Sequence, residues 1–308
     1  MTTPFNAAHH RFAWFTAFMT FLLIAAGALV TSNDAGLSVP DWPTSFGSLY
    51  RIPPMVGGVK FEHGHRMIAQ FIGLLTIILA VWTQKVDRRR WMRALGWAAL
   101  GTVIAQGVLG GITVLFYLPP AVSTAHATLA QTFFCILVCM ALFTGRRWVE
   151  AEPRTIVSSE RPTLNILATL SVAAVYVQLI LGAAFRHNGM KLVPHLVSAC
   201  IVTILLLWTV VRVLSRHSEI EQLRRPALAV LFLLVSQISL GFGAYLTRVE
   251  WNKDAPQPLE SMVATTVAHV AIGALLLATS VVLAVQARRH MAAKHEETVR
   301  TTPKAVIA

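Results

Sequence analysis

Eight apolar segments constrain this chain more than any other feature of its sequence. They cover approximately residues 12–31, 65–83, 92–116, 122–144, 164–185, 193–214, 226–247 and 262–287. Each has the length of about 20 residues that a helix needs to cross a bilayer. Hydrophobic residues make up 55% of the chain and charged residues 13%, which is unlike a soluble domain. The sequence therefore predicts an all-α membrane protein with eight transmembrane helices.

The net charge of +12 has a topological explanation. Basic clusters follow the second, fourth and sixth segments, at residues 85–90, 146–147 and 224–225, and the tail adds Arg288, Arg289, Lys294, Arg300 and Lys304. Lysine and arginine accumulate in cytoplasmic loops, so this pattern predicts a multi-pass protein of the cell (inner) membrane with both termini cytoplasmic. The same pattern accounts for the charge without nucleic-acid binding. The three cysteines lie in apolar runs and indicate no disulfide framework.

A repeated pattern links the helices in pairs. Gln-x-x-Leu-Gly stands late in one apolar segment, and a histidine stands early in the next. The copies are residues 106–110 with His126, 178–182 with His195, and 237–241 with His269, and a degenerate copy is 23–27 with His65. The glutamines fit either helix-to-helix contacts or support of a ligand, and the glycines allow close approach of helices.

This repeat predicts two four-helix bundles related by a pseudo-twofold axis along the membrane normal. The expected units are an N-terminal bundle (1–145), a cytoplasmic linker (146–163), a C-terminal bundle (164–290) and a cytoplasmic tail (291–308). The long outer loop 32–63 is expected to cap the first bundle, since loops of this length are often functional lids. Residues 248–260 form a shorter counterpart.

The four repeated histidines, His65, His126, His195 and His269, begin segments that run inward from the outer face. A single histidine in a membrane helix commonly serves interhelical hydrogen bonding. Four in matched positions favour metal ligation, because imidazole is a good ligand for iron and bundle cores hold cofactors between facing helices. We therefore predict that these histidines bind two haems, one per bundle and towards the outer face. The remaining seven histidines lie at ends or in loops and are not expected to play a comparable part.

Glu62 and Arg66 lie beside the first of these histidines. Glu62 is three residues before His65, on the same face if the helix begins early, where it would meet the rim of a haem. A solvated acid at a helix N-terminus explains it equally well. Arg66 could neutralise a haem propionate, as could Arg186 and Arg248, although interfacial anchoring is the commoner role for such residues.

The motifs around these residues resemble haem A synthase. The resemblance rests on Gly-Leu-Ser-Val-Pro-Asp-Trp-Pro at 36–43, on Glu62-x-x-His65-Arg66, and on the isolated histidines of the fourth, sixth and eighth segments. It implies oxidation of a methyl group of haem O to a formyl group with molecular oxygen, by successive hydroxylations, to give haem A for haem-copper oxidases.

The resemblance also implies roles for individual residues. His195 and His269 would hold haem b in the C-terminal bundle, His65 and His126 would hold the substrate haem O, and Glu62 would be catalytic. Partners would be an electron donor, haem O synthase or oxidase assembly factors, and membrane lipid, and a homo-oligomer is compatible with the family. Many bacterial members carry a cysteine pair in the first outer loop, which this sequence lacks, so the route of electrons stays open.

Two other functions fit the paired histidines. A dihaem membrane cytochrome b would pass electrons between quinol and an acceptor, and a haem carrier or chaperone would bind without turnover. The cytochrome needs neither a glutamate beside one pair only nor a large cap over one bundle.

Overall fold

The computed structural model describes residues 4–152, 156–158, 160–251, 254 and 258–293. Eight helices in this part of the chain are long and apolar enough to cross a membrane, which confirms the predicted number. They are α1 (Ala7–Ser32), α2 (Val59–Val86), α3 (Arg90–Leu115), α4 (Pro120–Phe143), α6 (Leu164–Arg186), α7 (Leu192–Arg216), α8 (Glu221–Tyr245), which continues into the π-helix η1 (Leu246–Glu250), and α9 (Glu260–His290).

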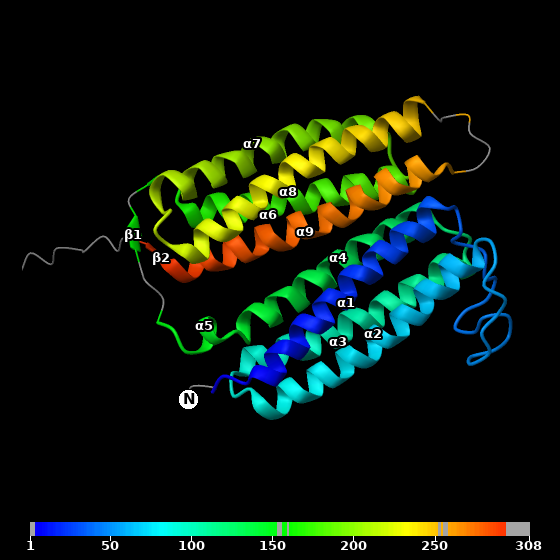
Figure 1. The fold of residues 1–308 in the computed structure, drawn as a ribbon, viewed down its shortest axis with the longest axis horizontal. Helices are drawn as coiled ribbons and strands as arrows, with labels where there is room; N and C mark the ends of the chain where they lie inside the picture. Colours follow the sequence, from blue (N-terminus) through cyan, green and yellow to red (C-terminus); the bar gives the residue numbers. More distant parts are fainter. Residues whose placement is uncertain (1–3, 153–155, 159, 252–253, 255–257, 294–308) are drawn as a thin grey trace, which may run out of the picture.

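The helices pack as two closed groups of four, as Figure 1 shows. In the first group α1 packs against α2 and α4, and α3 lies between those two; α6, α7, α8 and α9 repeat the arrangement. This packing agrees with the two predicted bundles. Each group encloses its own apolar core. The groups meet where α9 packs along α1 and α4, and Ala274 and Ala278 of α9 are buried within the first core. Small residues at such positions let helices approach closely.

The connections divide between the two ends of the bundles (Figure 1). At one end lie the first helix turns of α1, the short helix α5 (Arg146–Val149) and the strands β1 (Ile156–Ser158) and β2 (Met291–Ala293). At the other end lie the loop 33–58 and η1. The two strands pair in parallel, with Ile156 opposite Met291, and they add a small element to the expected all-helical chain. This pairing holds the linker and the start of the tail at one end of the molecule.

Most helices begin earlier than their apolar segments, and the early starts of α2 and α8 change the placement of charged residues. α2 begins at Val59, so Glu62 lies in its first turn. α8 begins at Glu221 and contains Pro226, so the basic pair 224–225 lies in the helix and not in the preceding connection. A proline near a helix start removes only one backbone hydrogen bond, which makes this early start tolerable. The basic tail residues Lys294, Arg300 and Lys304 lie outside the described part of the chain.

Candidate functional site

The four repeated histidines all lie in the first ten residues of their helices, at the end that carries the loop 33–58. Counting from the helix start, His65 and His126 are the seventh residues of α2 and α4, His195 is the fourth of α7, and His269 is the tenth of α9. At a rise of about 1.5 Å per residue these positions are at most about 15 Å from the helix ends. The repeat therefore brings its histidines to one end of the bundles.

Each complete copy of the repeat joins its glutamine to its own histidine. The Gln106 amide nitrogen lies 3.0 Å from the carbonyl oxygen of His126 and 3.3 Å from its ring Nε2. Gln178 makes the same two contacts with His195, at the same distances. The Gln237 amide lies 3.3 Å from Nε2 of His269. Each glutamine amide therefore makes a helix-to-helix contact and also contacts the imidazole, so both roles considered for the glutamines fit the structure.

The glycine of each copy faces the same imidazole. A Cβ added at Gly110 would lie 3.1 Å from Cε1 of His126. At Gly182 and Gly241 the distances to the corresponding ring atoms would be 2.8 and 2.9 Å, closer than real Cβ contacts. In the degenerate copy, a Cβ at Gly27 would lie 3.2 Å from Nε2 of His65. The spacing of four residues between glutamine and glycine puts both on one helix face, where one holds the ring and the other leaves room for it.

Replacing Gly241 with alanine is therefore expected to displace His269. The matched control is Gly243→Ala in the same helix, where the new Cβ would meet only Thr265 Cγ2 at an ordinary 3.6 Å. If His269 holds a haem, the first variant should lose about 10–100-fold in haem affinity, as when a ligand loses its support, and the second should not. Haem titration followed by absorbance measures both, and equal affinities would contradict the importance of this contact.

His195 and His269 lie close together in the C-terminal bundle. Their ring centres are 6.4 Å apart and the ring planes cross at 77°. Two imidazoles bound to one metal ion would have roughly this distance between their ring centres, because each metal–nitrogen bond is about 2 Å long and each nitrogen lies a short distance from its ring centre. His65 and His126 lie close enough for their charges to interact.

Unpartnered polar atoms also gather around these histidines. In the described part of the chain, twelve buried side-chain nitrogen or oxygen atoms have no hydrogen-bond partner, and six of them belong to the three glutamine–histidine pairs. In each pair they are the glutamine Oε1 and the histidine Nδ1. Buried polar groups without partners are unfavourable unless something binds them. A neutral imidazole binds metal through one ring nitrogen while its other nitrogen is held by a hydrogen bond. Each of these imidazoles has one nitrogen beside a glutamine amide and one without a partner, so these residues fit a haem group.

Glu62 and Arg66 form a buried ion pair that anchors the loop 33–58. The carboxylate is 4% exposed; its Oε1 lies 2.6 Å from an Arg66 nitrogen and its Oε2 accepts a bond of 2.8 Å from the Val39 amide. The other Arg66 bonds go to the carbonyl oxygens of Val39, Asp41 and Thr44. The terminal nitrogens of Arg66 therefore donate to the loop, and its proposed contact with a propionate stays a prediction.

Further contacts seat the same loop on α2 and α3. The Trp42 indole lies flat on α3, so that a Cβ at Gly111 would lie 2.4 Å from it. Gly111 follows Gly110, the residue that faces His126. His63, which the sequence analysis set aside, is buried and shares a 3.0 Å hydrogen bond with Ser45 of the loop. The loop thus lies directly over the N-terminal histidine pair.

Asp41 stabilises the fold of the loop itself. It accepts hydrogen bonds from the Thr44 hydroxyl and from the amides of Phe46 and Gly47. Burial alone would raise the pKa of Asp41, but these bonds outweigh it, and the pKa is lowered. A lowered pKa keeps the carboxylate ionised at neutral pH, so its contribution to stability is lost only on acidification through that pKa.

The end of α6 in the C-terminal bundle carries two residues that interact with the N-terminal bundle. Arg186 donates 2.8 Å to the Ser32 hydroxyl of α1, and its other terminal nitrogen is buried without a partner. His187 follows directly; burial, then Arg186 and His126, lower the pKa of His187 to about 4. No pattern in the sequence singles out His187, because its electrostatic interaction with His126 joins residues of different bundles.

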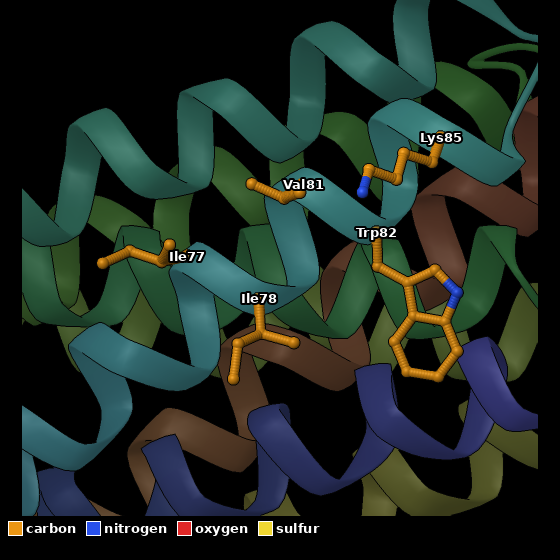
Figure 2. Close-up of a pocket in the computed structure, with 5 residues that line it drawn as sticks. All are labelled: Ile77, Ile78, Val81, Trp82 and Lys85. Atoms are coloured by element: carbon orange, nitrogen blue, oxygen red, sulfur yellow. The ribbon is translucent and has the colours of Figure 1, made fainter.

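A separate hollow lies on the flank of the N-terminal bundle. Figure 2 shows it on the flank of α2, lined by Ile77, Ile78, Val81, Trp82 and Lys85. Ile77 is twelve residues beyond His65, or about 18 Å along the helix. Its apolar lining suits the lipid-facing side of a membrane helix, and it is separate from the histidines.

Comparisons with known proteins agree with this architecture. The family COX15-CtaA, described as cytochrome oxidase assembly protein, matches residues 10–55 and 59–194. A protein of Symbiobacterium thermophilum named "Heme A synthase" is 30% identical over 71% of this chain and 80% of its own length. Proteins of the same name from Lysinibacillus sphaericus and Alkalihalophilus pseudofirmus are 29% and 24% identical, over 60% and 76% of this chain and 61% and 86% of their own lengths.

Proposed function

Since this chain belongs to the COX15-CtaA family of cytochrome oxidase assembly proteins, we propose that it is a haem A synthase, an oxidoreductase that converts a methyl group of haem O to the formyl group of haem A. Each hydroxylation takes one atom of molecular oxygen into the substrate and reduces the other to water, so an external electron donor is part of the proposal. Its cellular setting would be the cell membrane, with both termini cytoplasmic and the histidines towards the outer face.

In this proposal each bundle binds a different haem. His195 and His269 bind a resident haem b in the C-terminal bundle, which is supported by their ring separation of 6.4 Å. His65 and His126 bind haem O in the N-terminal bundle, where the loop 33–58 covers the site. A haem supplies redox chemistry when bound, while the protein sets its position and surroundings. A lipid-embedded site also keeps the long apolar tail of haem O out of water.

The observation that carries the assignment of the reaction to the N-terminal bundle is the buried pair Glu62–Arg66, one helical turn from His65. A carboxylate at the edge of a bound porphyrin can relay a proton or position the substrate. Arg66 pairs with this carboxylate, and both side chains bond the loop that covers the site in this proposal. No equivalent pair lies beside His195 in the described residues.

Arg186 is a better candidate than Arg66 for a haem propionate. One of its terminal nitrogens is buried and unpartnered, whereas those of Arg66 already donate to the loop. An arginine binds a carboxylate through charge-assisted hydrogen bonds, so a propionate would satisfy this nitrogen.

Purified protein loaded with haem O and given oxygen and a reductant should yield hydroxymethyl and formyl porphyrins, detected by mass. The His126→Ala variant is the control and should yield neither. Rapid quinol oxidation with unchanged porphyrin would support a dihaem cytochrome b instead. Haem release without either activity would support a carrier.

A further inference from the structure

The four copies of the repeat differ at one structurally decisive position. Gln106, Gln178 and Gln237 each stand four residues before the glycine that faces a histidine, and each amide contacts that histidine. In the first copy the same position is Leu23, which packs against the apolar core of the N-terminal bundle. His65 thus keeps its glycine, Gly27, but has no amide to hold it.

We expect the replacement of glutamine by Leu23 to leave the imidazole of His65 freer to rotate than the other three. An amide that bonds the histidine carbonyl and touches ring Nε2 restricts rotation of the ring. Within the described residues the His65 ring has no hydrogen-bond partner, and on α1 it faces Gly27, where an added Cβ would lie 3.2 Å from its Nε2. A ligand that is not held by a supporting group binds metal less firmly, commonly by 10–100-fold. His65 is therefore the least restrained of the four.

We infer that His65 is the exchangeable iron ligand of the N-terminal site, that His126 is its fixed ligand, and that Leu23 and Gln106 are the positioning residues that set this difference. The inference rests on the proposed function and deepens it. A substrate haem must enter and a product haem must leave in every turnover, while a resident haem stays. One loosely held ligand meets that need, and it lies one turn from Glu62, under the loop 33–58.

Leu23→Gln tests the inference by restoring the missing amide, and Leu23→Met is the control of similar size without a donor. Each protein is loaded with haem O, and no turnover is required. Two rates are measured: transfer of this haem to apomyoglobin, and carbon monoxide binding to the reduced N-terminal haem, which requires an axial ligand to leave. Leu23→Gln should slow both about tenfold, the effect of one ordinary hydrogen bond, and Leu23→Met should not.

Gln106→Leu is the converse variant and should speed haem transfer about tenfold, because His126 must also release the haem, while carbon monoxide binding, which already proceeds through release of His65, should rise only about twofold. Retention of the haem absorbance of the C-terminal bundle reports that each variant is folded; if Leu23→Gln fails to fold, Gln106→Leu decides. If Leu23→Gln and Gln106→Leu both showed wild-type rates, the inference would be overturned and the proposed function would remain intact. A wild-type N-terminal bundle that takes up no haem O would overturn the proposed function as well.

Discussion

Alanine in place of His195 or His269 removes the firmly bound haem and with it the Soret band of the C-terminal bundle. Loss of a direct ligand should lower haem affinity by more than the roughly 10–100-fold expected when only a supporting residue is lost. Absorbance spectra of the purified variants, normalised to protein, measure the effect.

The matched control is His217→Ala. His217 is also buried, but it lies directly after the other end of α7, where it contacts Glu160. This variant should retain its haem even if its stability falls. Substitution of His65 or His126 should instead mainly abolish turnover while the C-terminal haem remains. Equal haem loss from all four variants would contradict the division between bundles.

Replacing Glu62 with glutamine should lower the rate of porphyrin oxidation by about 10²–10⁴-fold, the usual contribution of a group that moves a proton in the reaction. Glutamine keeps the shape of the side chain but lacks the negative charge that faces Arg66. The bound haem of the C-terminal bundle should be unaffected. Product mass and haem absorbance on the same preparation separate the two effects.

A second variant distinguishes chemistry from anchoring of the loop. In Gly111→Ala the new Cβ would collide with Trp42, which should loosen the loop while Glu62 stays in place. Its matched control is Gly107→Ala in the same helix, where the Cβ would meet nothing within 4 Å. Hydrogen exchange of the loop amides measures the loosening. If Gly111→Ala loses as much turnover as Glu62→Gln, the glutamate acts only by holding the loop.

Sequence periodicity could predict the helices because each apolar segment is long enough to cross a bilayer by itself. The repeat also placed each histidine early in its helix, which is a local property of the chain. The beginning of α2 six residues before its apolar segment was not predicted, because the first turns carry polar residues such as Glu62 that face the loop and not lipid.

Tertiary contacts account for what the sequence did not reveal. The contact of Arg66 with a propionate stays a prediction, but the sequence did not reveal that this side chain bonds carbonyl oxygens more than twenty residues earlier in the loop. His187 interacts electrostatically with His126 of the other bundle, which no local pattern in the sequence indicates. The pairing of β1 with β2 joins segments over 130 residues apart, which the packing of α6 against α9 in the C-terminal bundle brings together.

The identity and number of porphyrins per chain test the central claim most directly. Protein purified from a host that makes both haem b and haem O is extracted, and its porphyrins are identified by mass and counted against polypeptide. The account predicts one haem b and up to one haem O or an oxidised derivative in the wild type, haem b alone in His126→Ala, and only the haem O series in His269→Ala. Haem b filling both bundles, with no haem O derivative in any preparation, would contradict it.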